Sequence, residues 1–441
     1  MGAEALTLFM FGGLLLGLFL GHPLAFVLGG VAVLAAFMGP GSQVFGLIIS
    51  RIYGGVMDSY ILVAVPLFIL MARFLSSSGV TDRMFETLRQ LMGGLRGGLT
   101  LSVIIISVLL AATTGIIGAS ITVMGMLALR PMLENGYRKD ICCGAIAAGG
   151  SLGVLIPPSI MLIIMASYAP VSVGELFAGA LIPGLVLAVL YGTYVLGASY
   201  LFPSLGPPLT AEQRALIEPR KLLLDLLKDV VPPLVLILGV LGSIFGGIAT
   251  ATEAAAIGAF LAFCFMIIYG SFDRADFFAC LRDTGKVTSM VLFVVVGATA
   301  FTGVFTAGGG LDVVREMLLG NELPVWAIIV VMLVIMFVLG MFLDWIGIVL
   351  LSFPIFLPIL EQMNVDILWF VVLSAVVLQT SFLTPPFGYA LFYLKGVASD
   401  DIAIGDIYRG VVPFVVLIII GAGLVAAFPG LILWLPNMMT Q

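Results

Sequence analysis

The sequence predicts an all-α membrane protein that crosses the bilayer many times and consists of two similar halves. Hydrophobic residues make up 62% of its 441 residues and charged residues only 10%, a composition typical of polytopic membrane proteins. The motif GVLIPPSI around Pro157 is matched by FLTPPFGY around Pro385, each inside a long apolar segment. Two matched apolar helices broken by proline predict a secondary transporter with its site at mid-membrane.

Ten apolar segments are long enough to cross the bilayer as helices. The expected crossings are residues 5–20, 24–39, 57–75, 141–170, 176–202, 231–249, 253–270, 287–306, 367–395 and 411–434. The first segment has the apolar character of a secretion signal. Because no basic residue precedes it and no small-residue cleavage site follows, we expect a retained helix.

Two further apolar runs are expected to enter the bilayer and return to the same side. The run Leu99 to Leu129 is flanked by basic residues, with Arg96 before it and Arg130 after it. Because basic flanks favour the cytoplasm, the run forms a re-entrant hairpin at about 98–130. A second hairpin is expected at about 325–360. A backbone that turns at membrane depth is tolerated only inside protein or beside a wet cavity, which indicates a binding site.

The chain is expected to divide into two repeats joined by a connector. The first repeat covers 1–203 with a broken helix at about 141–170, and the second covers 231–441 with a broken helix at about 367–395. Residues 204–230 combine basic side chains with a Leu-rich run. This pattern predicts an amphipathic helix on the cytoplasmic surface.

The basic residues predict the orientation. With these crossings, sixteen of the eighteen Lys and Arg residues lie in the cytoplasm, and only Arg51 and Arg315 lie outside. That bias follows the positive-inside rule and places both termini in the periplasm. Five crossings separate matched points of the two repeats, so the repeats are inverted. The first hairpin then opens from the cytoplasm and the second from outside, where residues 53–60 predict a short surface element.

The double prolines predict exposed backbone oxygens inside the protein. Proline lacks an N–H group and disfavours helix at the preceding residue, so the helices should be interrupted at Ile156 and Thr384. Freed carbonyls and nearby hydroxyls suit a small cation, and the helix N-termini after each break suit an anion. One such pair alone would indicate a kink that helps packing. Two matched pairs beside re-entrant hairpins favour a binding site.

The candidate ligands lie at the breaks and the hairpin tips. Near the breaks they are Gly150, Ser151, Gly153, Val154, Ser159, Gln379, Thr380, Ser381, Thr384 and Gly388. At the hairpin tips they are Thr113, Thr114, Gly115, Gly118, Ser120, Thr122, Gly340, Asp344, Trp345 and Gly347. An intramembrane carboxylate is energetically costly unless it is paired or hydrated. Asp344 is therefore expected either to bind the coupling cation, to carry a proton or to cap a helix. Glu253, beside Thr252 at a helix start, is expected to be a cap.

Other chemistries lack their motifs in this sequence. It has no HExxH zinc motif, no paired intramembrane aspartates and no Ser with a partner His, since His22 is the only histidine. The four cysteines show neither zinc nor disulfide spacing and are expected to pack. No Walker motif is present, so energy should come from an ion gradient. An anion channel remains a rival, although a channel does not require inverted hairpins.

The motifs GASITVMG, SLGVLIPPSI, ATATEAAAIGAF, VLGMFLD and FLTPPFG resemble the large membrane subunit of tripartite ATP-independent periplasmic (TRAP) transporters. The resemblance implies an ion-transporter-superfamily fold with scaffold and elevator domains in the bacterial inner membrane. It also implies sodium as coupling ion, a small four-helix membrane subunit, and a periplasmic substrate-binding protein that delivers a small organic acid. The chain further resembles a branch named for mannitol and chloroaromatic compounds, where 2-oxo acids, lactate or C4-dicarboxylates are expected cargo.

The resemblance assigns roles to the candidate residues. Sodium is expected at Gly150, Ser151, Gly153, Val154, Gly340, Asp344, Gln379, Thr380, Ser381 and Thr384. The organic acid is expected at Thr114, Gly115, Ser120, Pro157, Ser159, Pro385 and Gly388. Ile116 and Ile117 stand where many relatives have serine, which leaves hydroxyl roles at that tip to Thr114 or Ser120. Proton-coupled transport of an organic anion without a binding protein is the alternative function.

Basic residues are scarce around the expected site. Lys395 and Arg409 are the only ones after the second break, and Arg409 is expected in a cytoplasmic loop. A bidentate arginine clamp for a carboxylate is therefore expected on the binding protein. The membrane subunit would hold the anion with hydroxyls, helix ends and sodium ions.

Overall fold

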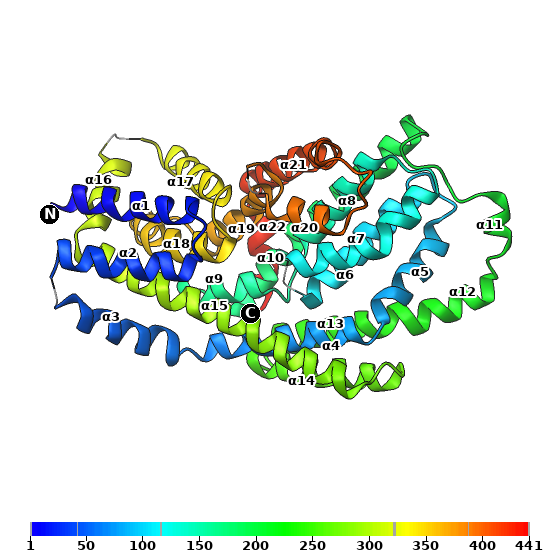
Figure 1. Cartoon of the computed structure of the whole chain (residues 1–441), viewed down its shortest axis with the longest axis horizontal. Coiled ribbons are helices and arrows are strands. Elements are labelled where there is room, and N and C mark those ends of the chain that lie inside the picture. Colours follow the sequence, from blue (N-terminus) through cyan, green and yellow to red (C-terminus); the bar gives the residue numbers. More distant parts are fainter. Residues whose placement is uncertain (1, 42, 115–116, 321–322, 387, 440–441) are drawn as a thin grey trace.

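The computed structural model of the chain describes residues 2–41, 43–114, 117–320, 323–386 and 388–439, and these form helices with no strand among them. Most of the long helices run along the longest axis of the molecule (Figure 1). Within the described residues, seven helices are long and apolar enough to cross a membrane. They are Tyr60–Ser77, Ile117–Glu134, Val173–Leu201, Ala251–Ile268, Arg274–Ala307, Trp345–Gln362 and Ile404–Ala427. Other expected crossings correspond to shorter apolar helices or to broken helix pairs.

The first five α-helices precede the first hairpin. They are α1 (Ala3–Phe19), α2 (Leu24–Met38), α3 (Val44–Ile52), α4 (Ala64–Ser77) and α5 (Val80–Met92). A π-helical turn, η1 (Tyr53–Met57), extends α3, and a 3₁₀ turn, η2 (Tyr60–Val63), leads into α4. Most of the residues 53–60, expected as a short surface element, are exposed, and the first part of this stretch continues the helical run of α3. The sequence analysis did not predict α3, because its apolar run is interrupted by Arg51 and by several glycines, including Gly46.

The first hairpin and the first broken helix follow. Helices α6 (Gly98–Thr114) and α7 (Ile117–Glu134) contact one another, and α8 (Lys139–Leu152) packs on both. The broken helix continues as α9 (Ile160–Tyr168), and α10 (Val173–Leu201) comes next. Helix α10 begins with a capping box, in which Ser172 and Glu175 bond to each other's backbone N–H groups.

The connector leads without interruption into the next long helix. It contains α11 (Ala211–Ala215), α12 (Pro219–Asp225) and the π-helical turn η3 (Leu226–Val230), and α13 (Val231–Phe245) starts at the following residue. The expected boundary at 230 thus lies inside a continuous helical run. None of the seven residues of α12 is buried, as expected for an element at a surface.

The second half repeats the order of hairpin and broken helix. Its helices are α14 (Ala251–Ile268), α15 (Arg274–Ala307), α16 (Gly310–Leu319), α17 (Val325–Gly340), α18 (Trp345–Gln362), α19 (Ile367–Leu383), α20 (Tyr389–Val397), α21 (Ile404–Ala427) and α22 (Gly430–Met439). Two expected crossings need correction. The one at 287–306 starts earlier, at Arg274, because the charged first turns continue the helix beyond the apolar run. The one at 411–434 is two helices, because Pro429 ends α21.

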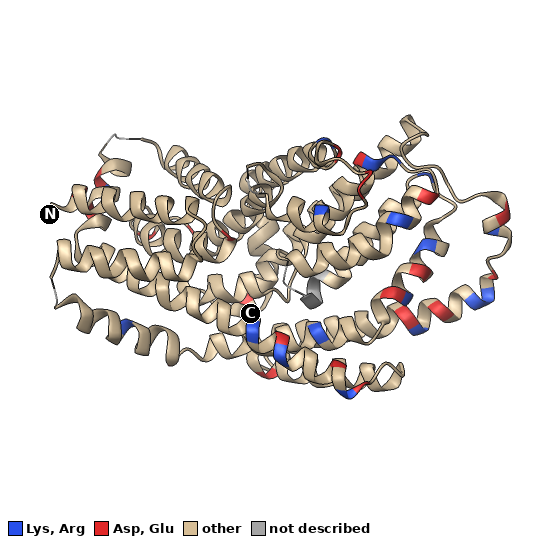
Figure 2. Ribbon diagram, in the orientation of Figure 1, with Lys and Arg blue, Asp and Glu red and all other residues tan. Residues whose placement is uncertain are grey.

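The two hairpins enter the molecule from opposite ends. Figure 1 shows α6 and α7 coming from the end that carries α5 and α11, and α17 and α18 coming from the end that carries α16. Their tips meet near the middle, where the two broken helices are interrupted. Basic and acidic residues gather mainly toward the end that carries α5, α11 and α12 and along the first turns of α15 (Figure 2). This arrangement positions the candidate site.

Candidate functional site at the centre of the fold

Both double prolines interrupt a helix, as the sequence predicts. Residues 153–159 separate α8 from α9, and residues 384–388 separate α19 from α20. The peptide bonds Pro157–Pro158 and Pro385–Pro386 are cis. Thr384 is the C-cap of α19, as expected, but α8 ends at Leu152, before the expected Ile156. Between them, the N–H groups of Val154 and Leu155 make turn-type bonds, so the helix loosens before the prolines.

Polar atoms at the first break are partly engaged within the chain. The Ser159 hydroxyl donates to the Val154 carbonyl, and the Ser151 hydroxyl donates to the Ala148 carbonyl at 2.9 Å. A carbonyl oxygen has a second lone pair, so Val154 keeps the capacity to ligate a cation. Gly150 packs against α7 of the first hairpin: a Cβ atom there would lie 2.3 Å from Ile121 Cγ1. The hairpin therefore touches α8 just before the break.

The second break has a corresponding contact with the second hairpin. A Cβ atom on Gly340, the last residue of α17, would lie 2.4 Å from Ser381 Oγ on α19. The Ser381 hydroxyl also donates to the Phe337 carbonyl of α17 at 3.4 Å. The hydroxyls of Thr380 and Thr384 donate to backbone carbonyls of α19, each at a distance of 2.6 Å. Gly340 and Ser381, both among the sodium ligands that the resemblance implies, thus lie together.

Two further polar side chains near the breaks lack a protein partner. Gln379 is fully buried, and neither its amide oxygen nor its amide nitrogen has a hydrogen-bond partner among the described residues. Ser107 Oγ on α6 is also buried and unpartnered, and a Cβ atom on Gly149 of α8 would lie 2.7 Å from it. Sequence reasoning proposed Gln379 but missed Ser107, which lies well before the hairpin tip in sequence.

A central cavity of about 270 Å³ lies between the hairpin tips and the broken helices. Four helices begin at its wall, because Ile117 of α7, Ile160 of α9, Trp345 of α18 and Tyr389 of α20 are each the first residue of their helix. The other wall is formed by α15. Among the described lining residues there is no lysine or arginine, and Asp344 is the only acidic side chain.

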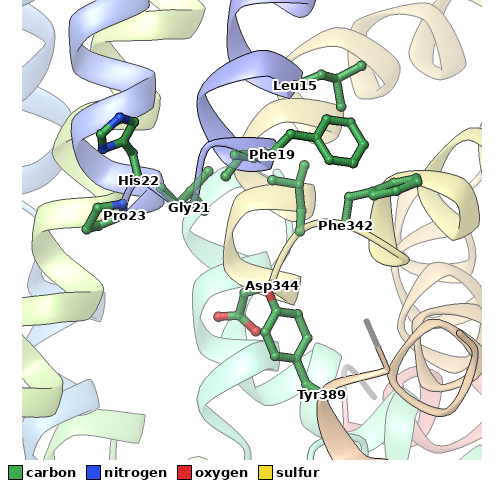
Figure 3. A pocket seen from close by; sticks show the side chains of 11 residues that line it. Leu15, Phe19, Gly21, His22, Pro23, Phe342, Asp344 and Tyr389 are labelled. Carbon is green, nitrogen blue, oxygen red and sulfur yellow. The ribbon is translucent and has the colours of Figure 1, made fainter. Parts of the chain in front are cut away.

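The central cavity continues toward both ends of the molecule. An outer cavity of about 250 Å³ lies between the α1–α2 turn and the second hairpin, and shares Asp344 and Tyr389 with the central one. Figure 3 shows these two side chains facing this space together with Phe342 and Phe19. A cavity of about 380 Å³ on the opposite side shares Gly118 and Tyr393 with the central one and is lined by Arg73. The three cavities therefore form a row.

Asp344 occupies the N-cap position of α18, but its side chain does not make the capping hydrogen bond that is usual at this position. Its carboxylate interacts with the backbone N–H of Trp345 and lines two cavities.

Glu253, in contrast to Asp344, caps a helix. It forms a capping box with Thr250, with Glu253 Oε2 accepting from the Thr250 backbone at 2.8 Å. The expectation of a cap holds for Glu253, with Thr250 rather than Thr252 as its partner.

The expected site residues divide into those that line the cavities and those that pack behind them. Asp344 lines both the central and the outer cavity. Ser120, Pro157, Ser159, Pro385 and Gly388 are not among the described lining residues of the three cavities. Thr114 is the last residue of α6, and Gly115 lies outside the described residues. Tyr389 and Tyr393 were missed, although their i, i+4 spacing after the break puts them on one helix face.

Comparisons with known proteins agree with this architecture. The family model described as "Tripartite ATP-independent periplasmic transporter, DctM component" matches residues 11–431. The sialic acid TRAP transporter large permease protein SiaM of Vibrio cholerae is 30% identical, over 96% of each chain. The C4-dicarboxylate TRAP transporter large permease protein DctM of Pseudomonas aeruginosa is 28% identical, over 86% of this chain and 87% of that protein.

A solved structure shares the fold without close sequence similarity. The YdaH transporter of Alcanivorax borkumensis aligns with a TM-score of 0.62 at 16% identity, over 88% of this chain and 89% of that one. The relatives are transporter permease subunits and not enzymes. With opposed hairpins, two broken helices and a family match over nearly its whole length, the chain belongs to the DctM component family of tripartite ATP-independent periplasmic transporters, as a large permease subunit.

Proposed function

We propose that this subunit carries out sodium-coupled uptake of a small organic acid across the bacterial cytoplasmic membrane by an elevator movement. A periplasmic binding protein delivers the acid, and a small four-helix membrane subunit completes the transporter. The expected cargo is a 2-oxo acid, lactate or a C4-dicarboxylate. Relatives named for C4-dicarboxylate and sialic acid transport support an organic acid as the cargo class.

The observation that carries the proposal is the convergence of four helix N-termini on the central cavity. Each helix N-terminus has unpaired N–H groups and a partial positive charge of roughly half an elementary charge. Together they favour an anion in a cavity whose described lining has no basic side chain. The cavity of about 270 Å³ suits a cargo of a few carbon atoms.

Sodium coupling is supported by the oxygen-rich breaks behind the cavity. Sodium is a hard cation, and carbonyl, hydroxyl and amide oxygens are suitable ligands for it. Ser381 and Gln379 supply such oxygens beside the second hairpin, and Ser151 and Val154 supply them beside the first. Sodium bound there brings hairpin and broken helix together, which links ion binding to the shape of the cavity. By reciprocity, the anion then tightens sodium binding by the same factor.

The deciding experiment is uptake of labelled pyruvate, lactate and succinate into proteoliposomes. The vesicles hold this chain with its small membrane subunit, and the cognate binding protein is added outside. We expect uptake of one cargo class that requires both an inward sodium gradient and the binding protein. Uptake without the binding protein, driven by a proton gradient, would replace the proposal by the proton-coupled alternative, and non-saturable flux would replace it by a channel.

A further inference from the structure

A fourth cavity lies apart from the transport site, where α8, α10 and α21 meet. Its volume is about 290 Å³, and its lining includes Arg138, Asp140, Tyr194, Phe202, Arg409 and Pro413. The first residues of α8 and α21 and the last of α10 form it, at the end of the molecule where basic residues gather (Figure 2). Nothing in the transport mechanism uses these side chains.

The charge of this cavity is positive. Asp140 is paired within the chain: Arg138 donates two hydrogen bonds to its carboxylate, and the Ile141 N–H donates a third at 2.9 Å. Burial raises the pKa of Asp140, but the bonds from Arg138 and Ile141 lower it by more, so the carboxylate stays ionised and paired. Arg409 is exposed and has no ion pair among the described residues. Its guanidinium is therefore available to an anion.

The walls beside the cavity are apolar and face outward. Phe202 is 61% exposed, and next to it Leu201 is 77% exposed at the end of α10. On α21, Val412 and Val416 are 58% and 50% exposed and follow Arg409 at helical spacing. Tyr200 lies under the Arg96 guanidinium at 5.8 Å, so aromatic and basic side chains occur together at this level. Such a belt is typical of the membrane–water interface.

From this combination we infer that the α8–α10–α21 cavity binds the phosphate of an anionic phospholipid, with Arg409 as its main cation. The cavity is close to the lower limit of about 300 Å³ for ligand pockets, which fits a head group but not a whole lipid. Acyl chains then lie along Val412 and Val416 in the bilayer. Basic pockets between transmembrane helices on the cytoplasmic side recognise anionic head groups in this way.

The test is native mass spectrometry of the full-length chain, purified with its small membrane subunit and delipidated. The complex is titrated with phosphatidylglycerol and with phosphatidylethanolamine of the same acyl chains. We expect the wild type to bind phosphatidylglycerol about tenfold more tightly, because both lipids offer a phosphate but phosphatidylethanolamine also carries an ammonium group, which the positively charged cavity repels. Arg409→Gln should abolish the preference, while Arg409→Lys should retain most of it. Arg214→Gln, on the exposed α11, is the matched control and should behave as wild type.

Three results would overturn the inference. The first is equal binding of the two lipids by the wild type. The second is an unchanged preference in Arg409→Gln, or an equal loss in Arg214→Gln. The third is displacement of phosphatidylglycerol by millimolar inorganic phosphate, which would identify a site for a free anion. Because lipid binding is measured without transport, failure of this inference is separate from failure of the proposed function.

Discussion

Ser381 lies where the second hairpin touches the broken helix α19. Its hydroxyl contacts the Phe337 carbonyl, and its side chain leaves room only for a glycine at position 340. In the proposed sodium site, the hydroxyl oxygen would coordinate the cation while its O–H group still donates to the Phe337 carbonyl, so one side chain would join hairpin, helix and ion. This explains why a small polar residue suits this position.

Replacing Ser381 by alanine should weaken sodium activation. Loss of one oxygen ligand and one hydrogen bond is worth about 1–2 kcal/mol, so the sodium concentration for half-maximal uptake should rise about tenfold. The measurement is sodium-dependent uptake in proteoliposomes. Ser374→Ala is the control, because the Ser374 hydroxyl bonds within its own helix to Val371 at 2.8 Å. An unchanged sodium response in Ser381→Ala would remove Ser381 from the proposed sodium site.

Asp344 is the acidic residue shared by the central and outer cavities. A carboxylate at membrane depth is costly unless it has a partner or a function. Its missing N-cap bonds argue against a purely structural role. We therefore propose that Asp344 takes part in binding the coupling cation.

Asp344→Asn keeps the shape of the side chain and removes its charge. We expect uptake to fall at least about tenfold, since a bound cation loses a charged partner. Asp312→Asn on α16 is a control at an exposed carboxylate and should leave uptake unchanged. Full sodium-driven uptake by Asp344→Asn in proteoliposomes would show that the carboxylate takes no part in coupling.

At the scale of elements, α8 and α21 pack with their backbones in contact. A Cβ atom on Gly410 would lie 2.1 Å from the Asp140 carbonyl oxygen, and one on Gly144 would lie 2.1 Å from the Gly410 carbonyl oxygen. Small residues at helix contacts are characteristic of membrane proteins, where close packing replaces the hydrophobic effect. Gly179 of α10 is also covered, by Ile432 and Val372.

Gly410→Ala should separate α8 from α21 and destabilise the protein. Because the contacts are with backbone, no rotamer change relieves them, and the cost should be about 1–3 kcal/mol or more. The measurement is the midpoint of thermal unfolding in detergent. Gly423→Ala on the same helix has open space around its Cβ atom and should be neutral or slightly stabilising. Equal midpoints for the two variants would contradict the close backbone contact.

At the scale of the whole molecule, charge and topology agree in outline. Charged residues gather toward the end carrying α5, α11 and α12, while the α1 and α16 end has few basic residues (Figure 2). The positive-inside rule predicts that the first end faces the cytoplasm. The α1–α2 turn and the outer cavity then face the periplasm, where a binding protein would deliver cargo.

Reporter fusions test this orientation. Alkaline phosphatase fused after Gln441 should be active, because it folds only in the periplasm and the C-terminus is expected there. A fluorescent protein inserted between α11 and α12 should fluoresce, because the connector is expected in the cytoplasm. The opposite pattern would invert the topology and with it the direction assigned to the row of cavities.

The sequence predicted some features of the site and missed others for physical reasons. The breaks were predictable because proline acts on its own backbone and that of its neighbours. The bounds of α21 and α22 were not, since an apolar run of that length is also typical of a single crossing. Tyr389 and Tyr393 were missed because an aromatic side chain is as often packed as exposed to a cavity. Ser107 was missed because it meets Gly149 only through packing.

The amino-acid sequence alone identifies this chain as a helical membrane protein of the TRAP large permease family and predicts that two of its helices break near the double prolines. These features follow from composition, ordered motifs and local backbone chemistry. The packing of the folded chain was needed to show that four helix N-termini share one cavity, that Gly340 meets Ser381, and that Arg409 lines a separate pocket. Those relations depend on how helices distant in sequence rotate and pack against one another, and no local pattern in the chain encodes that geometry.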